Sequence, residues 1–348
     1  MSSVKEDTLK GVKWSVFEKF AVQGIQFVLG IILARLLVPE DYGVVGMLAI
    51  FIAVSQTFID SGFASALIKK QNRTEDDYCT VFYFNFTIAL VCYIILFLCA
   101  PWIADFFHTQ LLCSVLRVQA ISLIINSIMA VQATKLTIEI NFRALSLRSI
   151  LSAVISGILG IVLAYFGWGV WAIVAQTLTA SVINTVFLWI YCKWIPRRPF
   201  SKKSFHELFA YGSKLLASGL INTVYSNLTT LVVGRFFTAK DLGVYNRGTS
   251  LPALPVWNIN GALQRVLFPI LSRYQDDDKL LIGYYRKYIG ITSLGIFFLC
   301  CLMAAVGKPL VLFLLTNKWE DCIIYLQLFS FSIMFDHLCI INQTLLLA

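Results

Sequence analysis

Residues 33–47, LARLLVPEDYGVVGM, recur 200 positions later as residues 233–247, VGRFFTAKDLGVYNR. Each copy joins a long apolar segment to the next one through an arginine, an acidic turn and a glycine. The positions that carry the same residue in both copies are Arg35 and Arg235, Asp41 and Asp241, Gly43 and Gly243, and Val44 and Val244. Agreement between loops at equivalent places predicts an internal repeat, and therefore two lobes of similar structure.

The segments on either side of these loops are long and apolar. Hydrophobic residues make up 58% of the chain and charged residues 14%, whereas a soluble domain has about 25% charged residues. About ten segments have the roughly 20 apolar residues that a helix needs to cross a bilayer. They are 13–36, 43–68, 79–103, 113–134, 147–167, 169–192, 208–234, 244–270, 285–306 and 322–347. We therefore predict an all-α polytopic membrane protein, since helices satisfy their own backbone groups within such spans.

The repeat divides the expected spans into two lobes. Residues 1–193 form the first lobe with six spans, and residues 194–207 form a basic cytoplasmic linker. Residues 208–348 form a second lobe with four spans, and the sequence stops within an apolar run. Because one copy holds an even number of spans, the copies should be parallel and related by an axis along the membrane normal. The second lobe is therefore expected to be incomplete.

The orientation follows from the distribution of basic residues. Most of the 28 Lys and Arg residues lie in the N-terminal segment and in every second loop after it. The linker at 194–207 is among the most basic of these loops. Loops that face the cytoplasm carry an excess of Lys and Arg. We therefore expect a multi-pass protein with its N-terminus in the cytoplasm, and the same asymmetry explains the net charge of +9.

Polar side chains inside the spans are the candidate functional residues, because they are costly in lipid and usually face a cavity, a partner or a transport pathway. They concentrate in spans that are equivalent in the repeat, and Gln26 shares a helical face with two of them. The residues predicted to line a substrate cavity are Glu18, Lys19, Gln23, Asp60, Lys214, Asn222, Tyr225, Asn258, Gln264 and Arg265. Those predicted to couple transport to a proton or another ion are Asp60, Asp336 and His337.

Several of these assignments have a structural alternative. Glu18, Lys19 and Lys214 lie near span ends, where long side chains can extend to the membrane surface. Asp60 could pair with Arg265, or it could cap a broken helix.

A buried histidine beside a carboxylate titrates near physiological pH, so Asp336 and His337 suit a proton site, but they could also form a purely structural pair. The fifth and sixth spans lack charged residues in their interiors. Their glycines, Gly157 and Gly160, predict close helix packing. The nine cysteines show no ligand spacing and are interpreted as packing residues.

Three segments carry a family resemblance: GVKWSVFEKFAVQGIQFVLGIILARLLVPEDYG at 11–43, RFFTAKDLGVYNRG at 235–248 and VLFPILSRYQDD at 266–277. They resemble the polysaccharide-exporter branch of the multidrug/oligosaccharidyl-lipid/polysaccharide (MOP) superfamily, which includes Wzx-type O-antigen flippases and exporters of colanic and teichuronic acids. The resemblance runs from Gly11 to the last residue. It implies a MATE-like bundle of two lobes with twelve to fourteen helices, so the chain is expected to be C-terminally truncated.

The resemblance also implies a function and a location. It points to a flippase of the cell inner membrane that moves undecaprenyl-diphosphate-linked oligosaccharide repeat units by alternating access. These units would serve the biosynthesis of O-antigen and lipopolysaccharide, capsule or exopolysaccharide. Buried Lys and Arg would bind the diphosphate, and amides and aromatic rings would contact the sugars. The implied partners are membrane lipids, a polysaccharide polymerase and a chain-length regulator.

Other functions fit the sequence less well. A cation-coupled multidrug or small-molecule extruder of the same fold would favour carboxylates in the cavity over Lys19, Lys214 and Arg265. A membrane-embedded polysaccharide polymerase or glycosyltransferase would need a large external loop, and the D-x-D motif at 276–278 lies in a short acidic turn. We expect no enzymatic activity, cofactor or metal site, because no catalytic, nucleotide-binding or metal-ligand motif occurs. The basic residues form no single patch for nucleic acid.

Overall fold

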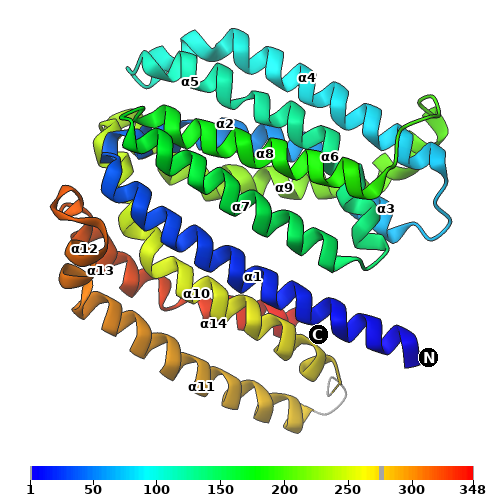
Figure 1. Cartoon of the computed structure of the whole chain (residues 1–348). Coiled ribbons are helices and arrows are strands. Elements are labelled where there is room, and N and C mark those ends of the chain that lie inside the picture. The colour runs from blue at the N-terminus through cyan, green and yellow to red at the C-terminus, as the bar shows by residue number, and fades with distance from the viewer. Residues whose placement is uncertain (1, 274–277, 348) are drawn as a thin grey trace. The chain divides into compact units, whose positions relative to one another are not determined.

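The computed structural model describes residues 2–273 and 278–347, with side chains described for 19–261 and 279–345. Every regular element in these ranges is a helix (Figure 1). The elements are α1 (Ser2–Leu36), α2 (Pro39–Asp60), α3 (Phe63–Lys69), α4 (Glu75–Phe106), α5 (Leu111–Gln119), α6 (Ile121–Ile138), α7 (Phe142–Tyr165), α8 (Val170–Cys192), α9 (Lys202–Phe236), α10 (Ala239–Arg273), α11 (Asp278–Ala305), α12 (Gly307–Leu315), the 3-10 helix η1 (Asn317–Trp319), α13 (Cys322–Ile333) and α14 (Asp336–Leu347).

Nine segments of the described chain are long and apolar enough to cross a membrane. They coincide with nine of the expected spans, so the prediction of an all-α polytopic membrane protein is confirmed. The remaining expected span, 244–270, lies within α10. This helix is 35 residues long, but polar residues such as Arg247, Asn258 and Asn260 interrupt its apolar sequence.

The sequence repeat is also a repeat of structure. α1 and α9 are each 35 residues long, and the helices that follow them, α2 and α10, begin 200 residues apart. At the first junction the Val38 amide donates a hydrogen bond to Asp41 Oδ2 at 3.2 Å, and at the second the Thr238 amide donates to Asp241 Oδ2 at 3.0 Å. The shared carboxylate therefore caps the start of the next helix in both copies. Hydrogen bonds from the Thr238 hydroxyl and amide lower the pKa of Asp241.

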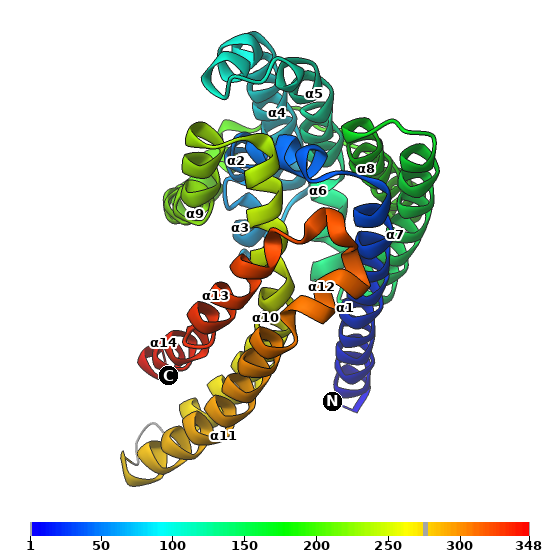
Figure 2. The same ribbon diagram turned by 90° about the vertical axis from the view of Figure 1, so that its left-hand side faces the viewer.

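The contacts divide the chain into two compact units, residues 1–242 and residues 243–348. In the first unit α1 packs on α7, α7 on α8, α4 on α6 and α9 on α2 (Figure 1). In the second unit α11 packs on α13 and α14, and α12 packs on α13 (Figure 2). The lobe boundary expected at residues 194–207 stays a prediction.

Glycines allow close helix contacts in the first unit. A Cβ atom at Gly157 of α7 would lie 2.1 Å from Leu29 Cδ1 of α1, and one at Gly160 would lie 3.1 Å from Gln176 Cβ of α8. The predicted close packing of these spans is thereby confirmed. The tightest contact is at Gly43 of α2, where a Cβ atom would lie 1.6 Å from the carbonyl oxygen of Ala239. The loop of one copy thus contacts the loop of the other through backbone.

A buried carboxylate links the segment before α4 to α9. Lys70 Nζ lies 2.9 Å from Asp77 Oδ1 and 2.9 Å from Glu207 Oε2. The side chain of Asp77 is 0% exposed, and its Oδ2 atom also accepts a hydrogen bond from the Thr74 amide at 2.8 Å. Burial acts to lower the pKa of Lys70, but the two carboxylates outweigh it and hold this pKa above its ordinary value.

Candidate functional site

The second span is broken directly after Asp60. α2 ends at Asp60 and α3 begins at Phe63, and the residues between them, Ser61 and Gly62, have φ angles of +40° and +70°. Asp60 Oδ1 accepts a hydrogen bond from Gln56 Nε2 at 3.1 Å. Asp60 therefore lies at a break in the helix, but this hydrogen bond joins it to Gln56 within its own helix, so a capping role of Asp60 stays a prediction. A carboxylate at a helix C-terminus is destabilised by the helix dipole, so a bound cation or a proton would stabilise it.

The broken segment packs against α9 through backbone. A Cβ atom at Gly62 would lie 2.8 Å from the Gly212 carbonyl oxygen, and one at Gly212 would lie 2.7 Å from the Ser61 carbonyl oxygen. Further along the same seam, the Thr57 and Thr223 hydroxyls share a hydrogen bond of 3.0 Å. Irregular backbone at membrane depth is tolerated where protein covers it. α9 provides that cover.

The polar residues predicted on α9 lie on a different face from this seam. Lys214, Asn222 and Tyr225 follow the spacing of one helical face, and all three are exposed. The exposed fraction of Tyr225 is 78%. The helix therefore uses its small residues to contact α2 and leaves its cationic, amide and aromatic face uncovered.

The remaining candidates of α1 and α10 are only partly described. In α1, Lys19 is exposed and Gln23 is half-buried. In α10, the amide nitrogen of Asn258 donates to the Leu254 carbonyl at 2.8 Å. The side chains of three further candidates lie outside the described residues, namely Glu18, Gln264 and Arg265. The alternative pairing of Asp60 with Arg265 therefore stays a prediction.

His337 is buried in the second unit and both of its ring nitrogens have partners. Its Nδ1 atom lies 2.7 Å from the Met334 carbonyl oxygen, to which it donates, and its Nε2 atom lies 2.8 Å from the Ser293 hydroxyl. These two hydrogen bonds hold the imidazole ring in place. The ring lies where the tenth expected span is interrupted, between α13 and α14. Asp336 starts α14, and its side chain is exposed while that of His337 is buried. The two hydrogen bonds of His337 thus go to Ser293 of α11 and to Met334, and both the proton site and the structural pair with Asp336 stay predictions.

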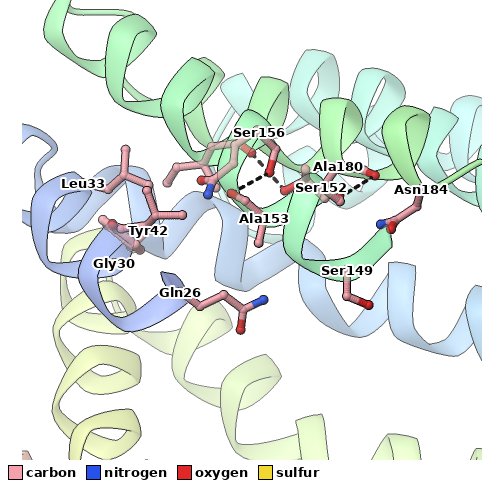
Figure 3. A pocket seen from close by; sticks show the side chains of 14 residues that line it. Gln26, Gly30, Leu33, Tyr42, Ser149, Ser152, Ala153, Ser156, Ala180 and Asn184 are labelled. Atoms are coloured by element: carbon pink, nitrogen blue, oxygen red, sulfur yellow. Dashed lines mark hydrogen bonds between the residues drawn. The ribbon is translucent and has the colours of Figure 1, made fainter. Parts of the chain in front are cut away.

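A polar cavity of about 420 Å³ lies within the first unit, between α1, α2, α7 and α8 (Figure 3). Ser152 of α7 donates to the Ala180 carbonyl of α8 at 3.0 Å at its edge. The Oδ1 atom of Asn184 is buried there without a hydrogen-bond partner among the described residues. The polar side chains of the lining are hydroxyls and amides: Gln26, Tyr42, Ser149, Ser152, Ser156, Gln176, Thr177 and Asn184. An uncharged polar lining suits sugar hydroxyl groups and does not suit a diphosphate.

Sequence reasoning misses most of this cavity. The helical spacing singles out Gln26, but α7 and α8 lack interior charges and are predicted only to pack closely. The available signal is periodic: Ser149, Ser152 and Ser156 recur on one face of α7, and Gln176 and Asn184 recur on one face of α8. None of the described residues predicted to bind substrate lines the cavity.

The arrangement of helices is that of a known class of membrane transporters. The chain is similar to a multidrug resistance MATE transporter of the MOP superfamily in its inward-facing conformation, with a TM-score of 0.64 and 17% identity over 93% of this chain and 82% of that one. It is also similar to the lipid II flippase MurJ in an inward closed conformation, with a TM-score of 0.70 and 14% identity over 96% of this chain and 76% of that one. The expected MATE-like fold is confirmed.

The family follows from the sequence match. Residues 32–324 match the family model described as "Polysaccharide biosynthesis protein", and the chain belongs to this family. It is 26% identical to the teichuronic acid biosynthesis protein TuaB of Bacillus subtilis over 92% of this chain and 66% of that protein. It is 25% identical to the lipopolysaccharide biosynthesis protein WzxC of Escherichia coli over 94% of this chain and 67% of that protein. The chain thus spans about two thirds of the length of these relatives. It is a membrane protein of polysaccharide biosynthesis with the fold of MOP transporters.

Proposed function

We propose that this protein is a flippase of the cell inner membrane that translocates undecaprenyl-diphosphate-linked oligosaccharide repeat units by alternating access. Membership of the polysaccharide biosynthesis family supports the pathway. The observation that carries the proposal is the repeat of α1 and α9, two equally long helices that both bring cationic and amide side chains into the membrane. Two such equivalent helices are what a carrier needs to open its binding site to either side in turn.

The uncovered face of α9 suits both parts of the substrate. The ammonium group of Lys214 would bind a phosphate oxygen of the diphosphate, together with Lys19 and Arg265. Asn222 and Tyr225 would contact the sugars, since an amide bonds hydroxyl groups and an aromatic ring packs on a sugar face. The uncharged cavity of Figure 3 offers hydroxyls and amides for a further sugar. A polymerase and a chain-length regulator would act on the unit after translocation.

Asp60 is the proposed ion-coupling residue. It lies at the C-terminus of α2, next to a break in the second span. Carboxylate and carbonyl oxygens at the end of a half-helix favour a bound monovalent cation or a proton. Asp336 remains a proposed partner in coupling.

The proposed function predicts loss of export when the charge of Lys214 is removed. We expect Lys214→Gln to reduce export about tenfold or more, because a hydrogen bond to a charged group contributes about 1.5–3 kcal/mol. The measurement is surface glycan and accumulated lipid-linked repeat unit in a bacterial strain that lacks its own repeat-unit flippase. Lys203→Gln, an exposed lysine near the start of the same helix, is the matched control and should leave export unchanged.

Two results would contradict these assignments. If the unmodified protein, inserted in the membrane, leaves the accumulated repeat unit unchanged, the flippase proposal is wrong. If the protein exports but Lys214→Gln exports equally well, the role of Lys214 alone is wrong. Lys214→Arg keeps the charge and should retain more export than Lys214→Gln.

The proposed orientation places the N-terminus and residues 194–207 in the cytoplasm. Single cysteines at Lys203 and Lys240, both exposed, test it in a variant without the nine native cysteines. A thiol reagent that does not cross the membrane should label position 240 in intact cells and leave position 203 unlabelled. Labelling of position 203 would show that the protein has the opposite orientation in the membrane.

A further inference from the structure

A second pocket lies at one membrane surface, where α8 ends and α4 begins. It has a volume of about 320 Å³. We name it the Trp194 pocket, and its lining comprises Glu75, Cys79, Lys193, Trp194, Ile195, Arg197 and Arg198. Both helices are candidate membrane spans that have an end at this place. The pocket is therefore at the depth where lipid headgroups lie.

The pocket is built around a fixed tryptophan. Trp194 is 7% exposed, and its Nε1 atom donates a hydrogen bond to Glu75 Oε2 at 2.8 Å. Its ring makes edge contacts with Tyr78 and Phe82, with centroids 6.3 Å and 6.1 Å away. These contacts hold the chain that follows α8 against the start of α4. The basic residues on either side of Trp194 are therefore carried on an anchored segment.

The lining of the pocket has three cations, Lys193, Arg197 and Arg198, and one carboxylate. Its one carboxylate, Glu75, is bonded by Trp194, and its Oε1 atom lies 4.0 Å from Lys135 Nζ. Arg198 Nη1 lies 3.2 Å from Asp76 Oδ1. Lys193 and Arg197 make no ion pair with any of the described residues. Two exposed cations of the lining are thus left without a neutralising partner.

Exposed apolar side chains adjoin these cations. Ile195 is 53% exposed and Phe200 is 44% exposed, and Ile190, in the last turns of α8, is 68% exposed. A free inorganic anion would gain nothing from these side chains. A ligand with an anionic head and an apolar tail would contact both the cations and the apolar surface.

We propose that the Trp194 pocket binds the phosphate headgroup of an anionic phospholipid from the leaflet at which α8 ends. Lys193 and Arg197 would donate charge-assisted hydrogen bonds to the phosphate. The acyl chains would lie along Ile190 and Ile195. The pocket is separate from the polar cavity of Figure 3, which contacts α8 only between Ile173 and Asn184. Lipid binding here would hold the linker at the membrane surface and does not depend on the glycan substrate.

Native mass spectrometry of the whole chain, released from nanodiscs, tests the proposal. The nanodiscs contain phosphatidylglycerol and phosphatidylcholine in equal amounts. We expect retention of phosphatidylglycerol over phosphatidylcholine, and a drop of about tenfold or more in its affinity in the double variant Lys193→Gln/Arg197→Gln. The matched control is Lys202→Gln/Lys203→Gln, which removes the same charge from exposed residues of the same segment outside the pocket. It should retain the lipid like the unmodified chain.

Competition with inorganic phosphate distinguishes a lipid site from a site for the free anion. Millimolar inorganic phosphate should not displace the lipid, and displacement would indicate a site for free phosphate instead. The charge-keeping variant Lys193→Arg/Arg197→Lys should retain the lipid. If the double variant Lys193→Gln/Arg197→Gln does not fold, the single variant Arg197→Gln replaces it in the measurement. Equal loss in the control pair would overturn the proposal by showing that only net charge matters. Equal retention of both lipids, or unchanged retention in the pocket variants, would overturn it as well.

Discussion

A Gly43→Val variant is expected to yield almost no folded protein. A Cβ atom at this position would lie 1.6 Å from the carbonyl oxygen of Ala239 and 2.5 Å from its carbonyl carbon. Both atoms are backbone, so no side-chain rotation can relieve the overlap. The junction between α9 and α10 would have to move away from α2. We expect a cost above about 4 kcal/mol, which is at the extreme of single substitutions.

The measurement for Gly43 is the yield of monodisperse protein in detergent and its melting temperature. Gly24→Val in α1 is the control, because a Cβ atom at Gly24 would have no neighbour within 4 Å. The control should melt close to the unmodified protein. Gly43→Val with an unchanged yield and melting temperature would show that the two junctions do not contact each other as described.

The second large effect is expected at Asp77, in comparison with its neighbour Asp76. Both aspartates lie in the first turn of α4 and pair with a cation. The side chain of Asp77 is 0% exposed, whereas that of Asp76 is 40% exposed. Removal of one member of a buried ion pair costs about 3–5 kcal/mol, while an exposed pair contributes about 0–1 kcal/mol. Asp77 also caps the Thr74 amide, and loss of a helix cap costs about 1 kcal/mol.

We therefore expect Asp77→Ala to lower the free energy of unfolding by about 3 kcal/mol or more, and Asp76→Ala by less than about 1 kcal/mol. Thermal unfolding of the purified variants, run side by side, measures this difference. Lys70 keeps Glu207 as a partner, so Glu207→Gln in the Asp77→Ala background should destabilise the protein further. Equal melting of the two aspartate variants would mean that Asp77 is not buried with Lys70.

Those parts of the fold that depend on local pattern are predictable from the sequence. The junctions at Asp41 and Asp241 are recognisable because a capping carboxylate and a following glycine leave a local signature. The spans are recognisable because a membrane helix needs only length and low polarity. The equal lengths of α1 and α9 follow from neither rule, and only the structure shows that the repeat extends over two whole helices.

The site is less predictable because it depends on which helix faces meet. A charged residue within an apolar span can be recognised from the sequence, whatever direction its side chain takes. The sequence therefore identifies Lys214 and Asp60 but not the serines of α7. Whether Ser152 lines a cavity depends on the distance between α7 and α8, which no single-helix pattern contains. Asp60 illustrates a partial success. A broken helix beside it is among the alternatives, and Ser61 and Gly62 form that break through their backbone angles, while its pairing with Arg265 stays a prediction.

The contact of Gly62 with Gly212 has a mechanical meaning. Here the backbone of the break in the second span approaches the backbone of α9, with the Leu215 side chain beside it. A side chain at either glycine would force the second span and α9 apart. Beside this contact the seam is also held by the ring of Phe63 packed on Phe205 and Phe209, by the hydroxyl pair of Thr57 and Thr223, and by the partly exposed ion pair of Lys70 with Glu207. The hydroxyl pair and the exposed ion pair each contribute little to stability, so the aromatic packing of Phe63 is the part of this seam that a relative movement of α2 and α9 would have to break.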